Sequence, residues 1–174
     1  MLLTYSLGIQ NRATQDIDFL VKGINLDSDN IKSILISIVS DSNQLDFWFE
    51  IAGDGEEIRS DDEYGGLRFG IIGHLSNIRI TFSVDIATGD PVYPAPVEEK
   101  YQTILGDRYD LKLYPIESIL SEKLHTILSR AENNSRSKDY YDIYTILNKQ
   151  IEQIDLEALK IAVSLTFRYR QTII

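Results

Sequence analysis

The sequence predicts an α+β fold, in which a mixed, mainly antiparallel sheet is followed by helices. Before residue 88, apolar and polar residues mostly alternate, as in strands with one buried face. From Pro115 onward, apolar residues instead recur every three or four positions, as on one side of a helix. Between these regions, Asp90–Pro96 holds three of the four prolines and interrupts regular structure. Strands followed by helices are typical of the α+β class.

The predicted strand region opens with Asp16–Val21, and the helix that follows is expected at Asn30–Ser40, with Asp27 to Asp29 available as N-caps. The other strands are expected at Asp46–Ile51, Leu67–Gly73 and Ile78–Ala87, with a turn at Gly53–Gly55. Pro115 suits the first position of the next helix. Two more helices are predicted, at Ser137–Lys149 and from an Asp155 cap to Tyr169. We expect a sheet domain at residues 1–113 and a helical region at 114–174 that packs on it without folding independently.

Composition excludes several classes of site. The chain of 174 residues has no cysteine, which rules out disulfides, thiolate metal sites and cysteine nucleophiles. Its two histidines are too few for a histidine-built zinc site. No apolar run approaches the roughly 18 residues that cross a bilayer, so we expect a cytoplasmic protein with no membrane partner. The net charge of −10 is the opposite of that of a typical nucleic-acid binder. Any RNA contact must therefore use a metal ion or a narrow strip of bases, for which the candidates are Arg12, Lys123, Arg130, Arg136, Lys138, Arg168 and Arg170.

Two acids at the start of the first strand are the main functional signal. Asp16 and Asp18 flank Ile17, so their side chains project to the same face, about 6–7 Å apart along the strand. Carboxylates at that separation repel by roughly 2–3 kcal/mol at an effective dielectric of about 20, and a cation removes the cost. Magnesium takes carboxylate oxygens and keeps waters that a phosphate displaces. The alternative is a pair of solvated acids on a strand edge.

Neighbouring residues favour the metal interpretation. Arg12 and Thr14 alternate with Asp16 on one face and add a forked donor and a hydroxyl. Asp85 is a third acid, on a later strand between apolar neighbours. Three acids on adjacent strands are the minimum for a phosphoryl-transfer site with two ions about 3.5–4 Å apart.

The motif order resembles a known family. R-x-T-x-D-I-D at residues 12–18 is similar to the catalytic strand of polymerase β-like nucleotidyltransferases. More narrowly, the chain resembles the AbiEii/AbiGii-type abortive-infection toxins, a family connected with phage defence. The other matching stretches are Tyr64–Arg68, Phe82–Asp90, Tyr114–Glu117, Ser121–Leu124 with Arg130, and Ser137–Asp142. Each motif is short, but their combined order is specific and spans nearly the whole chain.

The resemblance implies a function and a set of site residues. It implies a polymerase β-like mixed sheet with a C-terminal helical region, and magnesium-dependent transfer, with two ions, of a nucleotide from a nucleoside triphosphate (NTP) to RNA. The implied acceptor is the tRNA 3′ end, and the implied partner is an antitoxin encoded nearby. Asp16, Asp18 and Asp85 would bind magnesium, and Asp85 would take the proton of the attacking hydroxyl. Lys123 would contact the triphosphate, and the remaining nucleotide-binding residues would be Arg12, Thr14, Lys138, Asp139 and Asp142.

The downstream residues also have simple structural interpretations. Lys123 can be a solvated lysine that pairs with Glu117 or Glu122. Lys138 and Asp142 are spaced as an exposed i, i+4 pair, worth a few tenths of a kcal/mol. Asp139 can favour a helix N-terminus through the helix dipole. A kinase-like use of the same scaffold is a further alternative, because the K-D-x-x-D motif does not identify the transferred group.

The sequence departs from the family at its ends. The family's glycine pair, on a turn before the first acidic strand, would fall ahead of Met1, and members usually extend further at the C-terminus. Backbone N–H groups of such turns bind phosphate, so we expect weakened triphosphate binding. A late start codon, a cut gene segment and a natural remnant each explain the difference. The alternative function is therefore an inactive remnant that keeps the fold and binds nucleotide, RNA or a protein partner.

Overall fold

The computed structural model describes residues 15–41, 47–58, 65–103, 106–130 and 137–172. These residues form two compact units, one that ends at Asp90 and one that begins at Pro91. The predicted division into a sheet domain at residues 1–113 and a helical region at 114–174 remains a prediction. It concerns which parts fold independently, and compactness alone does not test that. The predicted α+β class is confirmed by a mixed sheet followed by helices.

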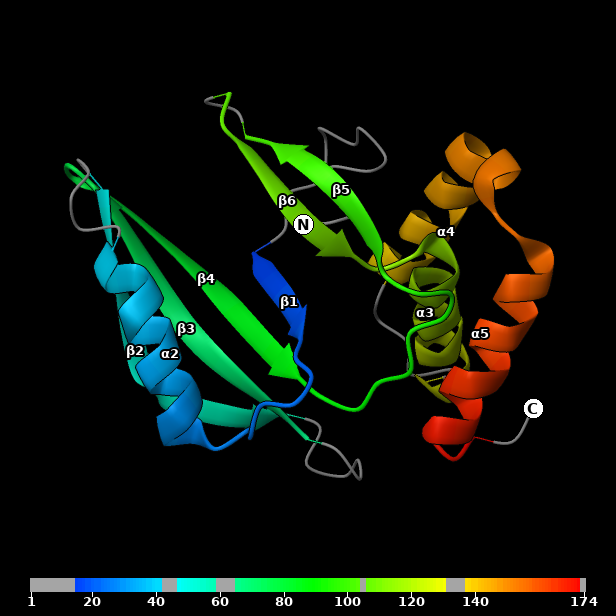
Figure 1. Ribbon diagram of the computed structural model, residues 1–174, viewed down its shortest axis with the longest axis horizontal. Coiled ribbons are helices and arrows are strands. Elements are labelled where there is room, and N and C mark those ends of the chain that lie inside the picture. Colours follow the sequence, from blue (N-terminus) through cyan, green and yellow to red (C-terminus); the bar gives the residue numbers. More distant parts are fainter. Residues whose placement is uncertain (1–14, 42–46, 59–64, 104–105, 131–136, 173–174) are drawn as a thin grey trace. The chain divides into compact units, whose positions relative to one another are not determined.

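The first unit is a four-stranded sheet covered on one face by a helix (Figure 1). Its strands are β1 (Asp16–Leu20), β2 (Phe47–Ile58), β3 (Gly66–Leu75) and β4 (Ile78–Ala87). They lie in the order β1-β4-β3-β2, with β1 parallel to β4 and the other pairs antiparallel. The helix is α2 (Ser28–Asp41), whose first turn is capped by Asp27 Oδ1, which accepts from Asn30 N at 3.1 Å.

The core of this unit lies between α2 and the sheet. Ile31 of α2 packs with the inward residues of β3 and β4, which are Leu67, Phe69, Ile71, Val84 and Ile86. Because side chains alternate along a strand, the residues between these positions face the side of the sheet opposite α2. That side includes Arg68 and Asp85.

Two irregularities distinguish the strands from the predicted ones. The predicted turn at Gly53–Gly55 lies inside β2, where the pairing with β3 shifts register between Ala52 and Glu56. Gly55 has a φ of +87°, and a Cβ built there would lie 2.7 Å from the ring of Phe69. The connection between β3 and β4 is shorter than the predicted strand bounds imply, because β3 extends to Leu75 and only two residues separate it from β4.

The second unit begins with a hairpin that the sequence pattern did not predict, β5 (Val97–Gln102) and β6 (Arg108–Leu113). Three helices follow, α3 (Ile116–Arg130), α4 (Ser137–Gln150) and α5 (Leu156–Tyr169), with the short 3₁₀ helix η3 (Ile151–Gln153) before α5. Helix α3 packs against both α4 and α5. Asp155 caps α5 as predicted, since its side chain accepts from Glu157 N and Ala158 N.

Buried side chains join these three helices. Leu120 of α3 and Ile146 of α4 form the centre of a second apolar cluster. Glu117, also buried, accepts a hydrogen bond from Asp155 N at 3.0 Å and so ties α3 to the start of α5. None of the helices in the described part of the chain has the length and apolar character needed to span a bilayer.

Candidate active site

The three predicted acids share the face of the first unit's sheet that lies opposite α2. Asp16 and Asp18 lie on β1, and Asp85 lies on β4. The parallel register of these strands places Asp18 directly beside Asp85 and Asp16 beside Ser83. Paired residues on neighbouring strands point to the same side. The predicted placement of three carboxylates on one face of adjacent strands therefore agrees with the strand register.

Arg68 completes this row of charges. It lies on β3 directly opposite Asp85. Its Nε and Nη2 donate to the two carboxylate oxygens of Asp85 at 2.7 Å and 2.6 Å, a bidentate pair. The hydrogen bond to Asp85 is the main cause that raises the pKa of Arg68, with further contributions from the charges of Asp85, Asp16 and Asp18. The negative charges of all three carboxylates thus stabilise the protonated guanidinium of Arg68.

The acids have the chemistry of a magnesium site, but they do not converge. Carboxylate oxygens are the ligands that hard divalent ions prefer. Within residues 15–41, 47–58, 65–103, 106–130 and 137–172, however, no three His, Asp or Glu side chains are grouped closely enough for a metal ion. Both oxygens of Asp85 are instead bonded to Arg68. The donor set fits the ion, and binding would require Asp85 to loosen its pair with Arg68.

Sequence reasoning included Arg68 in a motif but gave it no role. The register of the whole β3–β4 hairpin is fixed by the two-residue turn between Leu75 and Ile78, which places Arg68 opposite Asp85. The strand bounds expected from sequence leave a longer connection, which would place Arg68 opposite Ser83 instead. An arginine directly across from an acid on a shared face predicts an ion pair.

A shallow pocket of about 280 Å³ adjoins Arg68 on the same unit. It is lined by Arg68, by the small residues Ala52, Gly70 and Ser83, and by the irregular segment of β2. Glu56, at the end of that segment, lies opposite Arg68 in the β2–β3 register. A larger hollow of about 370 Å³ lies on the β5–β6 hairpin and contains none of the predicted site residues.

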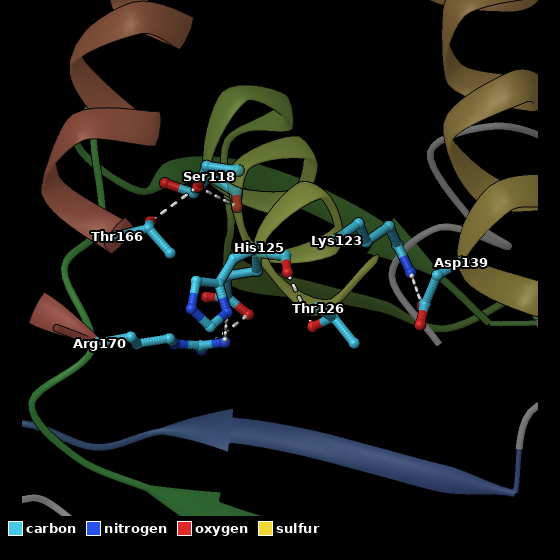
Figure 2. A network of polar contacts seen from close by, with 9 residues as sticks. Ser118, Lys123, His125, Thr126, Asp139, Thr166 and Arg170 are labelled. Atoms are coloured by element: carbon cyan, nitrogen blue, oxygen red, sulfur yellow. Dashed lines mark hydrogen bonds and ion pairs between the residues drawn. The ribbon is translucent and has the colours of Figure 1, made fainter. Parts of the chain in front are cut away.

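The second unit holds the other predicted cluster (Figure 2). Lys123 of α3 donates from Nζ to Asp142 Oδ2 at 2.7 Å and to Asp139 Oδ1 at 3.1 Å, both on α4. The Lys123 side chain is 16% exposed, that of Asp139 8% and that of Asp142 0%. Lys123 is therefore held by two buried carboxylates that were not among the partners considered for it from sequence. Asp142 is fully buried, which differs from the exposed pair with Lys138 considered there.

The remaining predicted residues are placed as follows. Lys138 is exposed in the first turn of α4, and Asp139, beside it, is buried at the same helix end. Arg12 and Thr14 lie outside the described residues, so the structure does not locate them. The acids and Arg68 lie on one sheet face of the first unit, and Lys123, Asp139 and Asp142 form a cluster within the second.

A separate polar network joins α3 to the end of α5 (Figure 2). Ser121 Oγ lies 2.9 Å from Thr166 Oγ1, and both side chains are buried. His125 Nε2 lies 2.8 Å from Thr172 Oγ1, and the imidazole packs edge-on against Phe167. These contacts give His125, which had no assigned role, a structural function in packing α3 against α5.

Comparisons with known proteins identify relatives of the fold and sequence. A family model described as the nucleotidyl transferase AbiEii toxin of a type IV toxin–antitoxin system matches residues 1–173. The crystal structure of JHP933 from Helicobacter pylori is similar, with a TM-score of 0.56 and 20% identity. The match covers 93% of this chain but 61% of that protein, so the chain spans less than two thirds of its length. At this identity the likeness shows the fold alone. No curated protein matches the chain.

Proposed function

The chain belongs to the AbiEii family of nucleotidyl transferase toxins from type IV toxin–antitoxin systems, and on this premise we propose that it transfers a nucleotide from an NTP to an RNA acceptor. The proposed acceptor is the 3′ end of tRNA, and the proposed partner is a cognate antitoxin encoded nearby. The observation that carries the proposal is the row of Asp16, Asp18 and Asp85 on one face of β1 and β4. Such a row is what nucleotide transfer requires, because the reaction depends on positioning and charge neutralisation.

Each acid has a role in the proposed reaction. The terminal hydroxyl of the RNA attacks the α-phosphorus, a new P–O bond forms, and the bond to pyrophosphate breaks. Asp85 accepts the proton of the hydroxyl. Asp16 and Asp18, with Asp85, are the residues that would hold two magnesium ions. Bound magnesium supplies neutralisation of the negative charge that spreads over the phosphate oxygens.

Lys123, Asp139 and Asp142 of the second unit are proposed as nucleotide-binding residues. Among the described residues, Lys123 makes two hydrogen bonds, to Asp139 and Asp142, so its third N–H can donate to a phosphate oxygen. Asp139 and Asp142 would fix the direction of the ammonium group, and the exposed Lys138 would add a second cation. Arg12 and Thr14 are proposed to contact the same nucleotide.

The test is a labelling reaction with purified protein, total tRNA and magnesium. Label on the α-phosphate of the NTP should enter RNA, whereas label on the γ-phosphate should not, which also separates nucleotide transfer from a kinase reaction. Asp16→Asn and Asp18→Asn should each lower labelling by about 100-fold or more, because a carboxylate needed for charge neutralisation is lost. Asp29→Asn, on α2 at the opposite face of the sheet, is the matched control and should retain full activity. Equal labelling by all three variants would overturn the proposal.

One observation favours a second candidate, an inactive remnant that binds nucleotide, RNA or a partner protein. The charge of Lys123 is already matched by two buried carboxylates, and Asp85 is already paired with Arg68. A chain without catalytic ions would be stable in this state. Nucleotide binding measured by calorimetry, with no label entering RNA at any magnesium concentration, would support the remnant.

A further inference from the structure

Arg68 has a carboxylate on each side of it across the sheet. Asp85 of β4 is its partner on one side, and Glu56 of β2 is its partner in register on the other. The guanidinium is bonded to Asp85, whereas no hydrogen bond of Glu56 is found within the described residues. Figure 1 shows β2, β3 and β4 running side by side in this order. Arg68 is therefore placed between an occupied acidic partner and an alternative one.

The bond to Asp85 blocks its use as a ligand. Both carboxylate oxygens accept from Arg68, and the side chain of Asp85 is only 14% exposed. Bidentate arginine–carboxylate pairs are among the stronger and more directional ion pairs. Since arginine stays protonated at any working pH, raising the pH does not release Asp85. A competing cation is needed instead.

The pocket beside Arg68 gives the guanidinium room to move. The side chain of Arg68 is 41% exposed, and the adjoining hollow of about 280 Å³ is lined in part by the small residues Gly70 and Ala52. Glu56 also lines this hollow. A rotation of the long arginine side chain toward Glu56 would thus exchange one carboxylate for another without burying an unpaired charge.

We propose that Arg68 is a positioning residue that alternates between Asp85 and Glu56, holding Asp85 in the metal-free protein and releasing it when a divalent ion binds. This inference rests on the proposed function, because it takes the acids to be the metal site. In the metal-free state Arg68 supplies the positive charge that three neighbouring carboxylates require. When the ion supplies that charge, the guanidinium becomes redundant beside Asp85 and pairs with Glu56.

The experiment measures binding of Mn²⁺ alone to the full chain by calorimetry, without NTP or RNA. Arg68→Gln removes the competing cation and should bind Mn²⁺ about tenfold more tightly than the unchanged protein. Glu56→Gln removes the alternative partner and should weaken binding about fivefold. Glu57→Gln is the matched control, because the neighbouring residue faces the other side of β2, and it should leave the affinity unchanged.

The double variant separates the mechanism from simple charge effects. If Glu56 acts only through Arg68, Glu56→Gln should have no effect in the Arg68→Gln background. A fivefold loss that persists there would overturn the proposal, as would unchanged or weaker Mn²⁺ binding by Arg68→Gln. If Arg68→Gln does not fold, Arg68→Lys takes its place, since it keeps the charge but loses the fork and should tighten binding about threefold.

Failure of the Arg68 exchange can be distinguished from failure of the proposed nucleotide transfer. The expected Mn²⁺ pattern without any RNA labelling would overturn nucleotide transfer and leave the Arg68 exchange standing. RNA labelling without this Mn²⁺ pattern would overturn the Arg68 exchange and leave nucleotide transfer standing. If no variant binds Mn²⁺ at millimolar concentrations, the exchange is wrong whatever the labelling shows.

Discussion

At the scale of single residues, the most consequential contact in the second unit is the lysine held by two buried acids. Removing one partner of a buried ion pair leaves an uncompensated charge and costs about 3–5 kcal/mol. Lys123→Met would remove the ammonium group that pairs with Asp139 and with the fully buried Asp142. We expect it to lower the free energy of unfolding by about 3 kcal/mol or more, as measured by urea denaturation.

The control for this substitution lies on α4. Lys138→Met removes an equal charge from an exposed position and should change stability by less than about 0.5 kcal/mol. Adding Asp142→Leu to Lys123→Met should recover part of the loss, because the stranded buried charge is removed as well. If Lys123→Met and Lys138→Met lower the free energy of unfolding by similar amounts, the buried pairs of Lys123 do not determine stability.

Two glycines in β2 separate backbone strain from steric clash. Gly53 and Gly55 both have positive φ values, +80° and +87°, so alanine is strained at either site. A Cβ at Gly53 meets nothing within 4 Å, whereas one at Gly55 lies 2.7 Å from the buried ring of Phe69. We expect Gly53→Ala to cost about 1 kcal/mol and Gly55→Ala about 2–4 kcal/mol in thermal unfolding. Equal costs would mean that the ring of Phe69 moves aside freely.

The two parts of the candidate site differed in how far sequence could predict them. The period of a strand places Asp16 and Asp18 on one face, so this placement is predictable from local sequence. The position of Asp18 beside Asp85 depends on the parallel pairing of β1 with β4, which no local pattern specifies. The partners of Lys123 depend on how α3 packs on α4, and this is also a tertiary property.

At the scale of elements, the start of α5 depends on a cap that α3 supports. Asp155 accepts from two N–H groups of the first turn, and its own N–H donates to the buried Glu117 of α3. Loss of an N-cap costs about 0.5–2 kcal/mol. Asp155→Ala should therefore lower the free energy of unfolding by about 1 kcal/mol, and Asp155→Ser should retain most of it. An Asp155→Ser variant as unstable as Asp155→Ala would assign the role to charge rather than to the cap.

Elements that bury an apolar face were predictable, and those that do not were missed. The predicted helix at Ser137–Lys149 and the one ending at Tyr169 agree with α4 and α5, which pack apolar stripes against α3. The β5–β6 hairpin is largely exposed, so its sequence carries little hydrophobic alternation. Its strands are held by backbone pairing, which side-chain patterns do not report. The extension of β2 beyond Ala52 was missed because Gly-Asp-Gly ordinarily marks a turn.

At the scale of the whole molecule, net charge limits how RNA could be held. The chain carries a charge of −10, and two of the candidate bases are engaged within the protein. Lys123 is paired with Asp139 and Asp142, and Arg170 Nη2 lies 3.9 Å from Glu122 Oε2. The strip of bases is therefore narrower than the sequence alone suggests. A protein of this kind can neutralise only a few phosphates of an RNA strand.

This limit gives a quantitative expectation for salt dependence. For single strands, the slope of log Kobs against log salt is about −0.7 per phosphate neutralised, so about three contacts give a slope near −2. We expect affinity for a single-stranded RNA oligonucleotide to fall by roughly 15-fold between 50 and 200 mM KCl, as measured by filter binding. Lys138→Gln should make the slope shallower by about 0.7, whereas Lys160→Gln, which removes a lysine paired with Glu157, should not. A slope near zero would exclude phosphate contacts. One steeper than about −5 would require a broad basic surface that the composition of the chain does not provide, and would point to a second, basic protein in the sample.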